Sequence, residues 1–194
     1  MRCGLLCFTV LVAVARGQNL SDCVKACLRP IASLHMTNAD IYLNYEKICD
    51  KLEPAAECAH KCGQDDHLQF HQLVTNFKLH CLEFEEELEP HLECLAEHAP
   101  GVDTECKKLC KQEHDDTPNG KQIAACKTSE CNMQCQVQKL SRTCPRSSKV
   151  QKKISIRKAQ ELEKAREHEQ FRLMPLECQN LHDSKHVARL FDDL

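Results

Sequence analysis

The sequence predicts an all-α protein, a small disulfide-stapled helical bundle with a charged helical C-terminal extension. Apolar residues recur along the chain at helical spacing, and no stretch shows a convincing strand pattern. Cysteines occur four times as pairs separated by three residues, in the motifs CVKAC, CAHKC, CKKLC and CNMQC. The first residues are typical of an export signal, which would place these cysteines in an oxidising compartment. Together these observations favour helices that are crosslinked by disulfides.

Residues 1–17 are expected to be a secretory signal peptide. Arg2 gives a short positive start, residues 5–14 form an apolar run, and small residues allow cleavage after Gly17. An uncleaved anchor is disfavoured, because the apolar run is shorter than the roughly 20 residues that span a bilayer. No later stretch is apolar enough for a transmembrane helix, so we expect a secreted, extracellular protein.

The cysteine count predicts a disulfide framework. Sixteen cysteines are present, and fourteen remain once Cys3 and Cys7 leave with the signal peptide. An even number in an exported chain indicates disulfides. The core needs them, because the chain has no Trp, few aromatic residues and 28% charged residues, and each bridge typically contributes about 2–4 kcal/mol. The candidate disulfide cysteines are Cys23, Cys27, Cys49, Cys58, Cys62, Cys81, Cys94, Cys106, Cys110, Cys126, Cys131, Cys135, Cys144 and Cys178.

Helix boundaries in the N-terminal half follow from capping residues, prolines and apolar spacing. The first helix is capped by Ser21 or Asp22 and should end before Pro30, and the second is capped by Asp40. A short third helix follows Pro54. The clearest helical pattern is an apolar stripe with steps of four, four, three and four residues, which runs until Pro90 and comprises Leu73, Phe77, Cys81, Phe84 and Leu88.

The C-terminal half is expected to contain two more cysteine-bearing helices and then a change in composition. A turn at Pro100-Gly101 should precede the helix with CKKLC, and a turn at residues 118–120 should precede the helix with CNMQC. Residues 151–172 are highly charged and have few apolar positions. We therefore expect a compact cysteine-rich helical domain at residues 18–145 and a looser charged extension at residues 146–194, with Cys178 as a tether.

The spacing of the cysteine pairs predicts how they bond. Residues four apart on a helix have Cβ atoms about 5–6 Å apart, whereas a disulfide needs about 3.8 Å. Each pair should therefore bond to a neighbouring antiparallel helix. Position along the chain favours two nested double staples, Cys23–Cys62 with Cys27–Cys58 and Cys106–Cys135 with Cys110–Cys131. From the sequence alone the connectivity stays open, because fourteen cysteines allow on the order of 10⁵ pairings. Zinc binding by the paired cysteines, with His60 inside CAHKC, is the disfavoured alternative, because exported thiols meet oxidants first.

Charge is unevenly distributed along a chain that has 29 acidic and 26 basic residues. Residues 79–106 hold nine acids and no Lys or Arg, whereas residues 131–160 hold eight Lys or Arg and no acid. We expect the acids to form a solvated helix face, with a basic partner, the chain's own basic segment 139–158 or a calcium site as alternatives. For the basic segment the alternatives to a solvated segment are sulfated-glycan binding and processing at Lys152-Lys153. Nucleic acid is not expected as a partner, since no aromatic residues interleave for stacking.

Three further features carry weaker chemical signals. Two histidine pairs are spaced one helical turn apart, His67 with His71 and His182 with His186. Such pairs can bind zinc when a third ligand converges, but solvated surface histidines are the expected interpretation. Asn19 begins an Asn-Leu-Ser sequon for N-glycosylation. No catalytic constellation stands out, so we expect no enzymatic activity and no cofactor.

The cysteine spacing over residues 23–144, from CVKACLRPI to Cys144, resembles the chondroitin proteoglycan 4 domain family of secreted nematode proteins. A second nematode family of extracellular, all-helical, cysteine-rich domains has similar spacing. The resemblance implies an extracellular or matrix-associated protein, with no active site to carry over. The family name implies chondroitin attached at Ser-Gly sites, and this sequence contains no Ser-Gly dipeptide.

These observations favour a non-enzymatic structural or interaction module of the extracellular space or matrix. Its partner is expected to be an extracellular protein or glycan, and the oligomeric state is left open. One alternative is an extracellular carrier of a small apolar ligand, with Leu73, Phe77 and Phe84 lining a cavity. The other is a secreted signalling protein released by processing at Lys152-Lys153.

Overall fold

The computed structural model confirms the all-α class and describes residues 20–32, 37–114, 116–167 and 169–193. No residue in these ranges belongs to a strand, and none of their helices is long and apolar enough to cross a membrane. The predicted signal peptide and Asn19 lie outside the described residues. In chain order the helices are α2 (Asp22–Ala32), α3 (Asn38–Leu43), α4 (Tyr45–His60), α5 (Gln64–Leu73), α6 (Thr75–Lys78), η1 (Leu79–Glu83), α7 (Glu85–Leu88), η2 (Glu89–His91), α8 (Leu92–Leu109), α9 (Pro118–Thr143), η3 (Pro145–Ser147), α10 (Ser148–Glu163), η4 (Lys164–Glu167), α11 (Glu169–Arg172), α12 (Leu176–Asn180) and α13 (Ser184–Arg189).

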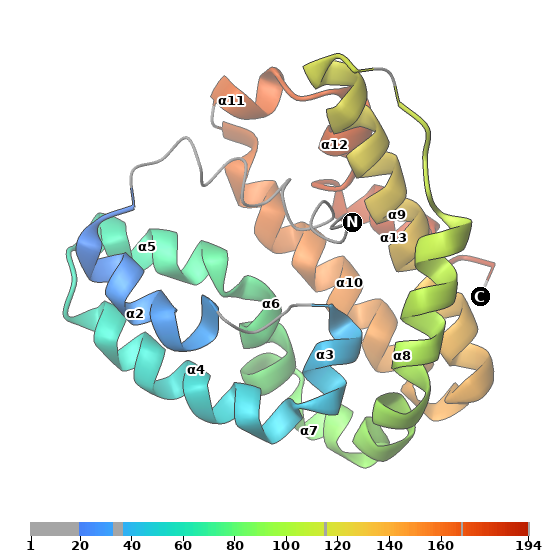
Figure 1. The fold of residues 1–194 in the computed structure, drawn as a ribbon, viewed down its shortest axis with the longest axis horizontal. Coiled ribbons are helices and arrows are strands. Elements are labelled where there is room, and N and C mark those ends of the chain that lie inside the picture. Colours follow the sequence, from blue (N-terminus) through green and yellow to red (C-terminus); the bar gives the residue numbers. More distant parts are fainter. Residues whose placement is uncertain (1–19, 33–36, 115, 168, 194) are drawn as a thin grey trace.

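The helices form two packed groups with α10 running between them (Figure 1). In the first group α2 packs on α4 and α5, around a core that includes Val24, Leu52 and Phe70. In the second group α8 packs on both α3 and α9. Its core includes Leu88 and Leu95, both without exposed surface. α10 contacts α6 and η1 on one side and α9 on the other, so it joins the two groups.

Local hydrogen bonds explain where the first helices begin. The hydroxyl of Ser21 accepts from the backbone N–H of Val24 at 3.1 Å, which makes Ser21 the capping residue of α2. Thr37 rather than Asp40 caps α3, because the Thr37 side chain accepts from the N–H of Asp40. The Asp40 carboxylate in turn accepts from the Thr37 backbone N–H. Asp40 is thus the second member of a capping box rather than the cap itself.

Proline does not end these helices, and this corrects three boundary predictions. Pro30 lies inside α2, Pro54 inside α4 and Pro100 inside α8. Each proline removes one backbone hydrogen bond and crowds the preceding turn. In α4 and α8 disulfide cysteines stand on both sides of the proline, so crosslinks hold both halves of the helix in place. The covalent constraint and the buried faces outweigh the local cost.

The apolar stripe that ends at Pro90 is not one helix, although its residues do face the interior. It is divided among α5, α6, η1 and α7, and η1 is a single π-type turn. The N–H of Phe84 donates to the carbonyl of Leu79 at 3.0 Å, five residues back. This wider turn buries three consecutive residues, Leu79, His80 and Cys81. A regular helix would turn one of them toward solvent.

The C-terminal segment packs more closely than the looser extension expected from its charge. Val150 and Ile154 of α10 are buried in the second core, four residues apart on one helix face. A third apolar cluster comprises Val137, Ala159, Val187 and Phe191 and joins α9 and α10 to α13. The Cys126–Cys178 disulfide ties α12 to α9. The apolar face of α10 is narrow, and the many charged residues around it made the segment look like an exposed helix in the sequence.

Candidate functional site

Seven disulfides pair all fourteen cysteines of the predicted mature chain, and this framework is the main chemical feature of the molecule. The structure contains all four bridges of the two expected double staples. The Cα–Cα distances range from 5.1 to 6.0 Å, as disulfide geometry requires. The bridges are Cys23–Cys62, Cys27–Cys58, Cys49–Cys81, Cys94–Cys144, Cys106–Cys135, Cys110–Cys131 and Cys126–Cys178. Such a framework is typical of proteins from oxidising compartments.

The double staple between α2 and α4 shows why paired cysteines do not bond to each other. Cys23 and Cys27 lie one turn apart on α2, and the inverted order of their partners makes α4 antiparallel to α2. The two bridges lie side by side, with the sulfurs of Cys27 and Cys62 3.9 Å apart. Cys23, Cys27 and Cys62 therefore converge as a metal site would, but each sulfur is already in a disulfide. The ring of His60 faces His71 at a centroid distance of 6.4 Å.

The acidic stretch pairs with the chain's own basic segment, which was one of the alternatives to a solvated acidic face. Glu87 accepts from Lys153 of α10 at 2.7 Å, and Glu83 accepts from Arg157 at 2.5 Å. We call these two ion pairs the charge clasp. It holds α10 against η1 and α7, and so neutralises the middle of the basic segment. Arg142, Arg146 and Lys149, which precede the clasp, are exposed or nearly so at the corner between α9 and α10.

Removing one acid of the charge clasp is expected to weaken the fold modestly. The Glu83→Gln substitution should lower the free energy of unfolding by about 1 kcal/mol, because the pair is roughly a third exposed and partly screened by water. The difference from the unmodified protein should shrink at about 1 M salt, where screening acts over a few ångströms. Denaturant unfolding at both salt concentrations measures this. The matched control is Glu86→Gln on the exposed face of α7. An equal loss of unfolding free energy in both variants would contradict a stabilising role for the Glu83–Arg157 ion pair.

His80 is a buried titratable residue that the sequence did not single out. Its side chain has no exposed surface, and Nδ1 lies 2.7 Å from the carbonyl oxygen of Asn76. The neighbouring Tyr42 ring lies 5.7 Å away, and the Tyr45 hydroxyl donates to the His80 carbonyl at 2.6 Å. Burial lowers the pKa of His80 to about 4, and the positive charge of Lys158 acts in the same direction. The neutral imidazole is therefore part of the folded core. The sequence held one indication of this burial, since His80 is next to Cys81 and three residues after Phe77, both of which were expected to face the core.

His182 and His186 do not converge on a shared metal site, and His182 is buried rather than a solvated surface residue as expected. Nδ1 of His182 lies 3.0 Å from the carbonyl oxygen of Leu162, whereas Nε2 of His186 lies 2.9 Å from the Glu130 carboxylate. These two rings therefore serve different contacts within the fold. In the other pair the side chain of His67 lies outside the described residues.

The residues proposed to line a carrier cavity do not converge. Leu73 and Phe77 pack in the first core, around α4. Phe84 packs instead against the second core, with Leu79 and Leu88. The three side chains thus contribute to the packing of two separate clusters.

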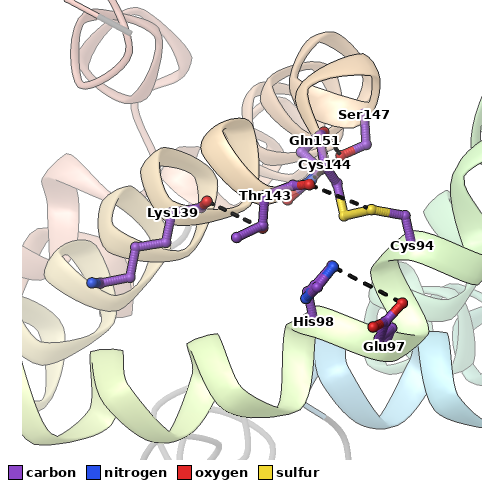
Figure 2. The surroundings of a disulfide bond; sticks show 8 residues. All are labelled: Cys94, Glu97, His98, Lys139, Thr143, Cys144, Ser147 and Gln151. Atoms are coloured by element: carbon purple, nitrogen blue, oxygen red, sulfur yellow. Dashed lines mark hydrogen bonds and ion pairs between the residues drawn. A yellow bond between two sulfur atoms is a disulfide. The ribbon is translucent and has the colours of Figure 1, made fainter.

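A partly exposed disulfide joins the start of α8 to the end of α9 (Figure 2). Cys94 is only partly buried, whereas Cys144 is 4% exposed. His98, one turn beyond Cys94 on α8, points toward the bridge, and its Nε2 lies 4.0 Å from the Glu97 carboxylate. One donor atom each from Cys94, Cys144 and His98 lies within 4.8 Å of the others. This is a ligand-like arrangement whose two sulfurs are bonded to each other.

Comparison of the chain with protein-family models, with curated proteins and with solved structures finds no match. The resemblance to the chondroitin proteoglycan 4 domain family therefore stays a prediction based on cysteine spacing.

Proposed function

We propose that this chain is a secreted, non-enzymatic structural or interaction module of the extracellular space. The observation that supports it most is the disulfide framework, which commits every cysteine of the predicted mature chain to holding helices together. Such a scaffold keeps its surface in a fixed shape in an oxidising compartment, where disulfides persist. The partner class is an extracellular protein or glycan that recognises that surface.

The arrangement of α10 disfavours release of a signalling fragment. Lys152 and Lys153 lie in the middle of this helix, and Lys153 is held by the charge clasp. A protease binds its substrate in an extended form, so the helix would have to unwind before cleavage. The Cys126–Cys178 bridge would still hold both fragments together after a cut.

Retention on an extracellular matrix tests the proposal. The full chain, expressed through the secretory pathway and purified in its oxidised form, is applied to decellularised matrix, with a reduced and alkylated sample as the control. We expect the oxidised protein to bind saturably and the reduced protein to bind much less, because only the former keeps the folded surface. Absence of saturable binding, or equal binding by both samples, would contradict the proposal. The proposal would also be contradicted if the chain stayed inside the cell with its cysteines as free thiols.

A further inference from the structure

The partly exposed Cys94–Cys144 disulfide at the junction of α8 and α9 lies beside an imidazole ring, in an arrangement that resembles the ligand set of a metal ion. Cys94 and His98 share one face of α8, and Cys144 ends α9 opposite them (Figure 2). Zinc binds thiolates at about 2.3 Å and imidazole at about 2.0–2.1 Å, which puts tetrahedral ligand atoms roughly 3.5–4 Å apart. The three donor atoms already lie within 4.8 Å of one another. Opening the sulfur–sulfur bond would leave them close to the separation that zinc requires.

We propose that Cys94, Cys144 and His98 bind Zn²⁺ when the Cys94–Cys144 bridge is reduced. The disulfide and the metal site are then two alternative states of the same side chains. His98 is 39% exposed, so zinc and a water molecule as fourth ligand reach the site from solvent. Two thiolates, one imidazole and a water make a four-coordinate zinc site with one open position.

The switch between the two states requires a small thiol as reductant, and its atoms and electrons balance. A thiolate attacks Sγ of Cys94, the less buried of the two cysteines, and Cys144 leaves as a thiolate. A second thiolate attacks the resulting mixed disulfide, which releases Cys94 as a thiolate and the reductant as its own disulfide. The bridge gains two electrons and the two thiols are oxidised. Zn²⁺ then binds both thiolates, and any proton they have taken up is released to solvent.

The remaining contacts between α8 and α9 would keep the open site assembled. Two further bridges, Cys106–Cys135 and Cys110–Cys131, still hold these helices antiparallel. Hydrogen bonds from Gln136 to Asp103 and from Lys139 to Glu105 also connect them.

The end of α9 is fixed independently of the bridge. The N–H of Cys144 donates to the carbonyl of Leu140 at 2.7 Å, and the hydroxyl of Ser147 donates to the carbonyl of Cys144 at 2.8 Å. Gln151 in turn donates to the Ser147 hydroxyl at 2.6 Å (Figure 2). The other sulfur cluster, which contains Cys27 and Cys62, would not stay assembled after reduction. Freeing its sulfurs breaks both disulfides between α2 and α4, so no bridge would remain to hold these helices together.

Cysteine alkylation mapped site by site tests the proposal. The oxidised full chain is exposed to rising concentrations of reduced glutathione, with or without Zn²⁺, and then alkylated and digested. We expect Cys94 and Cys144 to react in the absence of zinc and to react about tenfold more slowly in its presence, because zinc-bound thiolates are poor nucleophiles. The protection should be lost in His98→Ala and kept in His91→Ala, a nearby control histidine. Circular dichroism of each sample reports whether the helices remain folded.

Three outcomes would overturn the proposal. In the first, Cys94 and Cys144 stay unreactive until the helices unfold, so that the folded chain has no dithiol state. In the second, zinc gives them no protection. In the third, His98→Ala is protected as well as the unmodified protein, which would remove the histidine from the ligand set.

Discussion

Replacing Cys126 and Cys178 together by serine is expected to lower the free energy of unfolding by about 4 kcal/mol. The bridge closes a loop with a sequence separation of 52 residues, and the loop-entropy relation gives roughly that value for such a length. Both sulfurs are buried, so the fold also loses packing around them. Amide hydrogen exchange in α12 and α13 should become much faster, because this bridge ties α12 to α9. Denaturant unfolding and residue-resolved exchange measure the two effects.

The double substitution of Cys110 and Cys131 is the matched control. That bridge closes a loop with a separation of 21 residues, and the same relation gives about 3 kcal/mol. The control should destabilise the junction of α8 and α9 while α12 and α13 keep their slow exchange. If removal of Cys126–Cys178 left the stability of residues 20–145 unchanged, the C-terminal segment would be an independent extension after all.

Acidification from pH 6.5 to pH 4 is expected to lower the free energy of unfolding by about 3 kcal/mol through His80. The pKa of this imidazole is about 4 in the folded chain and about 6.5 once it is exposed by unfolding. Between these values the unfolded chain binds more protons, so stability falls as the pH falls. The contribution is complete above pH 6.5 and gone below about pH 4. Burial also lowers the pKa of His182, which acts in the same direction.

The His80→Asn substitution separates this effect from general acid sensitivity. The Asn amide can still donate to the carbonyl of Asn76, but it does not titrate. The variant should lose less stability than the unmodified protein over the same pH range, even if its stability at neutral pH is lower. Denaturant unfolding at several pH values between 4 and 7, in buffers of constant ionic strength, measures the two slopes. Identical slopes would show that the buried imidazole is not the group responsible.

Some of the framework could be predicted because disulfide geometry is restrictive. Cysteines four residues apart on a helix are too far apart to bond, so Cys23 and Cys27 had to find partners on another helix. The order along the chain then favoured Cys62 and Cys58, and the structure pairs them in this way. For the remaining three bridges, no local spacing indicated which cysteines would bond. Cys126 and Cys178, for example, are 52 residues apart and meet only because α12 folds back on α9.

Other features could not be predicted because tertiary packing overrides local signals. Pro54 and Pro100 carry the strongest local signal for a helix end, yet both lie inside helices that disulfides hold on either side. The burial of His80 depends on the π-type turn in η1, which local spacing does not reveal. Val150 and Ile154 are only two apolar positions in a strongly charged stretch, and their burial depends on where α10 lies. In each case the deciding contacts come from distant parts of the chain.

The measurement that tests the central claim most directly is disulfide mapping of the secreted, non-reduced protein. Digestion without reduction, followed by mass spectrometry, identifies the peptides that each bridge joins. We expect Cys23 linked to Cys62, Cys27 to Cys58, Cys106 to Cys135 and Cys110 to Cys131, together with the three bridges to Cys81, Cys144 and Cys178. A bridge within one pair, such as Cys23–Cys27, or a set of free thiols would contradict a helical bundle that is stapled by disulfides.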